Sequence, residues 1–242
     1  MNTSNVAIVT GGTGSVGREL LPLLVQRSFK IGVTYLVPEE ATELEAQLES
    51  ELDASDDELL LSRVDASDAR SMEKFVQEVV DAFGGVNVLC CLVGGWSGGR
   101  DVEETDDVRF DRMIDLNLRS TFNAVRATIP HLKKQDWGRI VLMGSRHASV
   151  TPTGQAAYNI AKAGVAALGR SVAVELSDTN VTCNVLLPSV IDTPTTRAAL
   201  PYAEYVDWPK PAEIANVIDF LTSHRSAVID GAEIPVWGAA EI

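Results

Sequence analysis

The sequence is poor in the residues that bind metals or form disulfides. Its 242 residues include three cysteines and three histidines. Cys90 and Cys91 are adjacent, Cys183 stands alone, and all three lie in apolar, strand-like runs without metal-ligand or redox spacing. We therefore expect three buried thiols, no bound metal and a reducing compartment such as the cytoplasm.

Basic residues and long apolar runs are also scarce. Lys and Arg total 20 against 34 Asp and Glu, so the formal net charge at pH 7 is −14. Nucleic acids and anionic membrane surfaces require clustered cations, so this charge argues against both as partners. No apolar run reaches membrane-spanning length, and the chain starts without a signal-type stretch. We expect a soluble cytoplasmic protein that binds neither nucleic acid nor a membrane surface.

Apolar runs instead alternate regularly with amphipathic, helix-like segments. The runs predicted as strands are Val6–Val9, Ile31–Leu36, Leu59–Val64, Val86–Val93, Ile140–Met143, Val181–Leu187 and Ala232–Val236. Such alternation requires right-handed crossovers, so it predicts an α/β fold with a doubly wound parallel sheet of about seven strands and helices on both faces. Because 45% of the residues are hydrophobic and no linker is visible, one domain over residues 1–242 is expected.

A glycine-rich turn follows the first predicted strand. Residues 10–17 read TGGTGSVG and continue into an amphipathic helix. Glycine permits a tight turn and close approach of a pyrophosphate, whose charge the helix N-terminus attracts, so this order predicts a dinucleotide-binding Rossmann domain. The residues expected to contact the cofactor here are Gly11, Thr13, Gly14, Ser15, Val16 and Gly17. A Walker phosphate loop is excluded because Gly-Lys-Ser/Thr is missing.

The stretch from Gly138 to Gly164 carries three polar residues suited to proton transfer. Ser145 follows a strand-like run, and Tyr158 and Lys162 lie one helical turn apart on the same face of a predicted helix. A cation within about 4–6 Å favours a phenolate, so Lys162 is expected to lower the pKa of Tyr158. Tyr158 could then exchange a proton with a carbonyl or alcohol oxygen that Ser145 holds by a hydrogen bond.

Ser145, then Tyr158 thirteen positions later, then Lys162, resembles the active-site segment of the short-chain dehydrogenase/reductase family. The resemblance is to a 3-oxoacyl-ACP-reductase-like body and covers essentially the whole chain. It implies an NAD(P)(H)-dependent oxidoreductase that reduces a ketone or 3-oxoacyl carbonyl, or oxidises the corresponding alcohol, with Tyr158 as proton donor. Asn117, on a helix predicted over residues 107–134, completes the catalytic set, and its backbone carbonyl would hold a water linked to Lys162.

The same resemblance implies further cofactor contacts. Asp65 would orient the adenine amine, although it could equally cap the next helix, and Thr193 would hydrogen-bond the nicotinamide half. Two segments depart from the family pattern: the turn reads TGxxGxxG, and Cys91-Leu92-Val93-Gly94 replaces Asn-Asn-Ala-Gly. The contacts carried over are Tyr35, Asp65, Ala66, Val93, Gly94, Tyr158, Lys162, Pro188, Ile191 and Thr193.

The end of the second predicted strand selects the cofactor in such folds. An acidic side chain there binds the ribose hydroxyls of NAD, and a basic one accepts the phosphate of NADP. The deciding positions hold Tyr35 and Leu36, and Glu39 and Glu40 follow closely. The sequence therefore favours NAD(H), with NADP(H) possible.

Two segments are expected to form the substrate pocket. Five of the ten prolines fall within residues 188–211, a stretch that should stay out of the sheet and act as a substrate lid. Trp96, in the glycine-rich loop GGWSGG, could form the wall of a flat substrate pocket or anchor the loop in the core. Together with Ser145, Trp96 is the predicted substrate contact.

Alternatives to carbonyl reduction stay open. GGWSGG and the segment around Arg197 and Trp208 resemble the dihydropteridine reductase branch, which implies an NADH-dependent pterin reductase. A non-catalytic dinucleotide sensor is the alternative of another class. The family also implies a homotetramer or homodimer, and the apolar outer face expected for its contacts comprises Ala163, Val165, Ala166, Leu168 and Val172.

Overall fold

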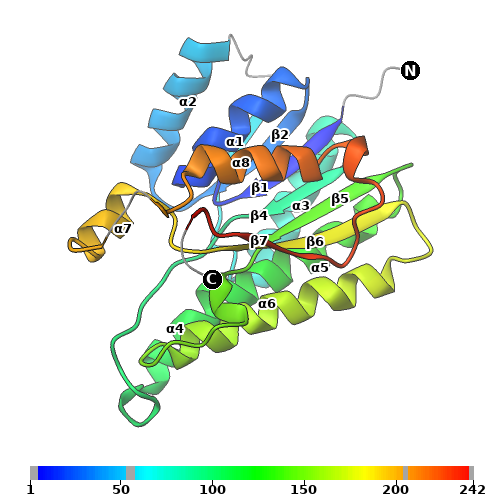
Figure 1. Ribbon diagram of the computed structural model, residues 1–242. Helices are drawn as coiled ribbons and strands as arrows, with labels where there is room; N and C mark the ends of the chain where they lie inside the picture. The colour runs from blue at the N-terminus through cyan, green and yellow to red at the C-terminus, as the bar shows by residue number, and fades with distance from the viewer. Residues whose placement is uncertain (1–4, 53–57, 204–206, 240–242) are drawn as a thin grey trace.

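The computed structural model describes residues 5–52, 58–203 and 207–239, and its centre is one parallel sheet (Figure 1). The strands are β1 (Val6–Thr10), β2 (Lys30–Tyr35), β3 (Leu59–Arg63), β4 (Val88–Cys91), β5 (Gly138–Met143), β6 (Val181–Pro188) and β7 (Glu233–Val236). Their order across the sheet is β3-β2-β1-β4-β5-β6-β7. Every neighbouring pair is parallel, so the predicted doubly wound α/β fold is confirmed.

Helices cover both faces of this sheet. The α-helices are α1 (Ser15–Gln26), α2 (Pro38–Leu52), α3 (Ala69–Phe83), α4 (Asp107–Ile114), α5 (Ser120–Leu132), α6 (Ala156–Glu175), α7 (Pro194–Ala199) and α8 (Pro211–Leu221). The 3-10 turns are η1 (Val102–Glu104), η3 (Arg146–Ala148) and η5 (His224–Ser226), and η2 (Asp115–Arg119) is a π-helical turn. Helices α1, α2 and α8 pack on one face of the sheet, and α3, α5 and α6 on the other (Figure 1).

The sheet is buried between two apolar layers. Leu20 and Ile218 belong to one layer, Phe75 and Val172 to the other, and all four are at most 3% exposed. A fully buried side chain of this size contributes about 1.5–3 kcal/mol. This two-sided burial explains why the strands read as continuous apolar runs rather than as alternating patterns. Cys90, Cys91 and Cys183 are all buried and free, as predicted.

Two local predictions need correction, and a third is refined. The helix predicted over residues 107–134 is continuously helical from Asp107 to Leu132 and contains the π-helical turn η2. Pro188 does join the sheet, because it is the last residue of β6 and pairs with Val236, where a missing N–H is tolerated. Val165, Ala166 and Val172 are buried in the monomer, because the α6 face that carries them packs on the sheet rather than outwards.

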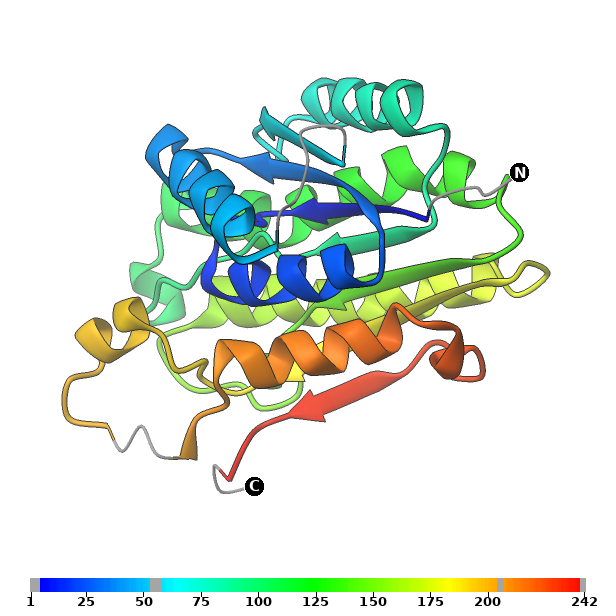
Figure 2. The ribbon, with the colours of Figure 1, turned by 90° about the horizontal axis from the view of Figure 1, so that it is seen from above.

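The carboxyl ends of the strands form the edge where the predicted site lies. Gly11 follows β1, Leu92 follows β4, and Ser145 closely follows β5. Figure 2 shows α7 beyond this edge, on the side towards which the strand arrows point. Across the residues that the structure describes, none of the helices combines the length and apolar character needed to span a bilayer.

Candidate active site

The glycine turn brings backbone rather than side chains to the edge of the sheet. Gly11 has a φ of +68°, which favours glycine, and its carbonyl accepts a hydrogen bond from Gly14 N at 3.1 Å. A Cβ atom on Gly17 would lie 2.3 Å from the carbonyl oxygen of Gly12, so α1 can approach the turn this closely only without a side chain there. Gly14, the N-cap of α1, has no side chain, so no side-chain cap occupies the first N–H groups of the helix.

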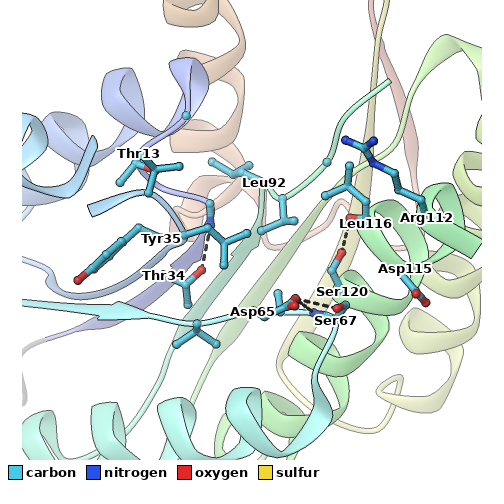
Figure 3. A pocket seen from close by; sticks show the side chains of 18 of the residues that line it. Thr13, Thr34, Tyr35, Asp65, Ser67, Leu92, Arg112, Asp115, Leu116 and Ser120 are labelled. Atoms are coloured by element: carbon cyan, nitrogen blue, oxygen red, sulfur yellow. Dashed lines mark hydrogen bonds between the residues drawn. The ribbon is translucent and has the colours of Figure 1, made fainter. Parts of the chain in front are cut away.

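A cleft of about 790 Å³ opens beside this turn (Figure 3). Eight predicted cofactor contacts line it: Gly11, Thr13, Gly14, Tyr35, Asp65, Ala66, Val93 and Gly94. The cleft is also lined by residues that were not predicted. These belong to β2, to α4 and to η2, where they are Asp115 and Leu116. Its size, the helix N-terminus and the exposed glycine backbone of the turn fit the pyrophosphate and ribose groups of a dinucleotide.

Hydrogen bonds hold the walls of the cleft. Thr34 Oγ1 accepts from Gly11 N at 3.1 Å, and Asn123 Nδ2 donates to the carbonyls of Ala66 and Ser67 at 3.1 and 2.9 Å. The sequence analysis missed Asn123, because its partners lie more than 50 positions away and no local pattern marks it.

Asp65 does not cap a helix. Its carboxylate accepts from the backbone N and the hydroxyl of Ser67, at 2.9 and 2.7 Å, and so closes the turn after β3. The cap of α3 is Asp68, which accepts from Ser71 N at 2.7 Å. The helix-cap alternative for Asp65 is therefore wrong.

Negative charge surrounds the end of β2. Glu40 lines the cleft, and its Oε2 accepts from Thr13 Oγ1 at 2.8 Å. Arg18 donates to Thr13 O, Glu40 O and Glu43 Oε2 at 2.9, 3.1 and 2.9 Å. Arg63 Nε donates to Leu36 O at 3.1 Å. Arg18 and Arg63, the guanidinium groups beside the end of β2, thus already donate to the protein, whereas Arg112 of α4 lines another part of the cleft.

Lys162 lies beneath the ring of Tyr158 at the end of β5. Its Nζ donates to Met143 O at 2.8 Å and lies 5.8 Å from the centroid of the Tyr158 ring. Only 3% of Lys162 is exposed, and this burial lowers its pKa to about 8. The ammonium is therefore the major form at neutral pH, as the predicted role requires.

Tyr158 has a raised pKa rather than the lowered one that its spacing from Lys162 predicts. Burial is the larger cause, and it outweighs a hydrogen bond with Ser145 that lowers the pKa. The prediction fails because removing water from around the phenol costs the phenolate more than that hydrogen bond returns. Ser145 itself is 4% exposed, so the hydroxyl and the phenol meet in a largely buried place.

Asn117 joins the cleft to the Lys162 side of the site. Its Oδ1 accepts from Gly95 N at 3.1 Å, and its Nδ2 donates to Gly95 O and Met113 O at 3.0 and 3.1 Å. A Cβ atom on Gly94 would lie 3.0 Å from Asn117 Oδ1 and 3.2 Å from Lys162 Nζ. The side chain of Asn117 thus holds the loop after β4, a task that the resemblance did not imply, and the π-helical turn places it there.

Trp96 is half exposed and tethered rather than buried. Its indole N–H donates to Gln155 Oε1 at 2.7 Å, and 51% of the residue is exposed. Gln155 directly precedes α6, which carries Tyr158. The hypothesis that Trp96 anchors the loop in the core is therefore wrong, because a hydrogen bond near the surface tethers the indole instead.

The remaining predicted contacts lie outside the lining of the cleft. Thr193 Oγ1 accepts from Thr196 N at 3.1 Å and caps α7, so its side chain is engaged locally. Ile191 packs against the apolar layer formed with α1 and α8. The residues of this group are Ser15, Val16, Gly17, Pro188, Ile191 and Thr193. Within the predicted lid, residues 204–206 lie outside the described residues.

Comparisons with known proteins agree with this geometry. The short chain dehydrogenase family model matches residues 5–202. A 3-oxoacyl-[acyl-carrier-protein] reductase, MabA, of Mycobacterium bovis is 30% identical over 97% of this chain and 92% of its own. The 2-(R)-hydroxypropyl-CoM dehydrogenase of Xanthobacter autotrophicus is 29% identical over 98% of both chains.

Structural similarity extends over the same length. The crystal structure of a dehydrogenase/reductase from Sinorhizobium meliloti 1021 superposes with a TM-score of 0.86 at 27% identity, covering 98% of this chain and 95% of that one. The family model, the relatives of similar length and the superposed structure all agree. The chain belongs to the short-chain dehydrogenase/reductase family of NAD(P)-dependent oxidoreductases.

Proposed function

We propose that this enzyme reduces a ketone or 3-oxoacyl carbonyl with NADH, or oxidises the corresponding alcohol. The observation that carries the proposal is the contact of the Ser145 hydroxyl with the Tyr158 phenol, above a buried Lys162. A carbonyl oxygen needs two such donors when it gains negative charge. The two similar relatives are named for a 3-oxoacyl thioester and for a secondary alcohol, which supports the same substrate class.

The residues divide the proton chemistry between them. When bound, the nicotinamide group supplies the hydride. The Ser145 hydroxyl donates a hydrogen bond to the carbonyl oxygen, and Tyr158, kept neutral by its raised pKa, gives that oxygen its proton. The Lys162 ammonium stabilises the phenolate that remains, until water returns the proton. The complete set with Asn117 favours this enzyme over a non-catalytic sensor, which has no need of proton transfer.

The cofactor proposed is NAD(H). The first N–H groups of α1 would bind the pyrophosphate, Asp65 and Ala66 would contact the adenine, and the nicotinamide half would pass over Gly94. Glu40 faces the cleft with its carboxylate, and a 2′-phosphate beside it would be repelled. The engaged state of Arg18 and Arg63 supports the same preference.

A panel assay tests both parts of the proposal. Purified enzyme is mixed with NADH or NADPH and with acetoacetyl-CoA, simple ketones, sugars or quinonoid dihydropterin. We expect oxidation of NADH by the thioester or a ketone, and a KM at least about tenfold higher for NADPH. Tighter binding of NADPH would contradict the cofactor assignment, and activity with none of the carbonyl compounds would contradict the substrate class.

Pterin reduction is the second candidate, and Trp96 favours it. The tethered, half-exposed indole presents a rigid flat face suited to stacking on a fused ring. We rank it second because a ring C=N reduction has less need of the Ser145 hydroxyl. Rapid NADH oxidation with quinonoid dihydropterin alone, abolished by Trp96→Ala, would reverse this order.

We also propose a homotetramer or homodimer. Helices α4, α5 and α6 carry apolar side chains that are 39–74% exposed: Phe110, Phe122, Ile160 and Val174. Covering them with a second copy would remove this apolar area from water. Light scattering at micromolar concentration should give a mass above the monomer's 26.0 kDa, and a monomeric mass would contradict the proposal.

A further inference from the structure

His147 contacts both the hydroxyl and the phenol of the site. It lies two residues after Ser145 in η3, and its Nδ1 is 3.1 Å from Ser145 Oγ. Its ring centroid lies 5.5 Å from that of Tyr158, with an interplanar angle of 74°, so one ring presents its edge to the other. Nothing in the proposed chemistry so far uses this imidazole.

The single proton of Ser145 cannot serve every neighbour. Ser145 Oγ already accepts from the backbone N–H of His147 at 3.2 Å, and the hydroxyl also hydrogen-bonds Tyr158. If the imidazole proton is on Nε2, then Nδ1 is an acceptor and takes the serine proton for itself. If the proton is on Nδ1, it donates to Oγ, and the serine O–H is left to point towards Tyr158 and the substrate oxygen.

We propose that His147 is a positioning residue whose Nδ1–H donates to Ser145 Oγ and thereby directs the serine proton to the substrate oxygen. The inference rests on the proposed role of Ser145 as a donor. With both lone pairs of Oγ bound to N–H groups of His147, the hydroxyl has one direction left. A hydroxyl that accepts hydrogen bonds is also the stronger donor, because neighbouring hydrogen bonds polarise one another.

Two surroundings of the ring bear on its tautomer. Among the residues that the structure describes, Nε2 has no hydrogen-bond partner of either kind, so the hydrogen bonds at Nδ1 distinguish the two tautomers. Burial and the charge of Arg146 lower the pKa of His147, so the neutral ring is the relevant form at pH 7 and its tautomer decides the outcome.

A matched pair of variants tests the donor. His147→Asn keeps an N–H at the position of Nδ1, and His147→Leu has the same branched shape without it. With NADH and acetoacetyl-CoA, or the most active compound of the panel, we expect Leu to lower kcat about tenfold and Asn to stay within about threefold of wild type. The KM for NADH should be unchanged in both. Equal losses in the two variants would overturn the inference.

The Ser145→Ala background tests whether His147 acts through the serine. In that background, adding His147→Leu should lower kcat by less than about a further twofold, because the hydroxyl that His147 directs is gone. A full tenfold loss in that background would show that His147 acts elsewhere, and it would overturn the proposal.

Nitrogen NMR gives a readout that needs no substrate. The chain has three histidines, so the ¹⁵N-imidazole signals of His147 are assigned by their loss in His147→Asn. We expect protonation on Nδ1 in the wild type and a shift away from it in Ser145→Ala. Protonation on Nε2 in the wild type would overturn the inference, whether or not any carbonyl compound of the panel is reduced. Failure of the panel alone would count only against the proposed function.

Discussion

The two halves of the site are built in opposite ways. At the turn between β1 and α1, missing side chains shape the cleft, because Gly17 lets the helix approach the backbone of Gly12. At the junction of β5 and α6, outside the lining of that cleft, the site consists of buried polar side chains, above all Tyr158 and Lys162. Binding by the backbone of the glycine turn depends on its conformation alone, whereas the chemistry of the side-chain cluster depends on which groups carry protons.

This difference explains how each half tolerates change. Ser15 replaces a glycine of the family's usual pattern, yet its backbone still forms the first turn of α1, so the helix N-terminus is kept. In the proposed mechanism no such substitution is open to Tyr158, because its phenolic proton is the one transferred. Gly94 belongs to both halves, since it lines the cleft and lies against Asn117 and Lys162.

Removing the phenol should have the largest effect. Tyr158→Phe keeps the ring and its packing but loses the proton donor, so we expect turnover to fall about 10²-fold or more with NADH binding nearly unchanged. Steady-state kinetics and a fluorescence titration with NADH measure the two quantities. The control is Tyr202→Phe, because Tyr202 is fully exposed and lies outside the lining of the cleft, so its variant should bind NADH as the wild type does. Near wild-type turnover in Tyr158→Phe would remove it from the mechanism.

The second-largest effect is expected from adding a methyl group at Gly94, where the two halves of the site meet. In Gly94→Ala the new Cβ must displace Asn117 Oδ1 and Lys162 Nζ, so we expect kcat/KM to fall about thirtyfold. Gly14→Ala is the matched control, because its Cβ would meet only Gly11 O at 3.3 Å and its φ is −70°. We expect less than about a threefold change there. A larger loss in Gly14→Ala than in Gly94→Ala would break the comparison between the halves.

A rise of one pH unit should have the smallest effect, and it sharpens the description of the side-chain half. The pKa of Lys162 is about 8, below that of a free lysine, so the ammonium is lost as pH rises through that value. Tyr158 has a raised pKa and keeps its proton over the same range. We expect kcat/KM for reduction to be level below pH 8 and to fall about tenfold per unit above it. Circular dichroism would check that the fold persists, and a flat profile to pH 9.5 would contradict the assignment.

Local patterns predicted most of the fold. Buried parallel strands require continuous apolar runs, and the seven runs found in the sequence all became strands in a confirmed sheet. Boundaries were less accurate: the run ending at Val93 forms a strand only to Cys91, because Leu92 and Val93 leave the sheet to line the cleft. The π-helical turn η2 inside the long helix was missed, since residues 107–134 contain neither proline nor glycine before Pro130.

Site residues divide in the same way. Tyr158 and Lys162 could be paired from sequence because helical spacing alone places them on one face. The surroundings that set their chemistry could not be predicted from sequence. Lys162 donates to a carbonyl 19 positions away, and burial, a property of the whole fold, shifts both pKa values. His147 was within reach of sequence reasoning, since it lies two residues from Ser145, but only the geometry shows its Nδ1 turned towards that hydroxyl.

The sequence by itself therefore determined the order of strands and helices, the glycine turn and the reactive side chains, since each depends on neighbours within a few residues. Only the tertiary structure decided which protons those side chains keep and which loops they hold. Hydrogen bonds such as that from Asn123 to Ala66, and the loss of water around Tyr158 and Lys162, arise when segments far apart in the chain pack together.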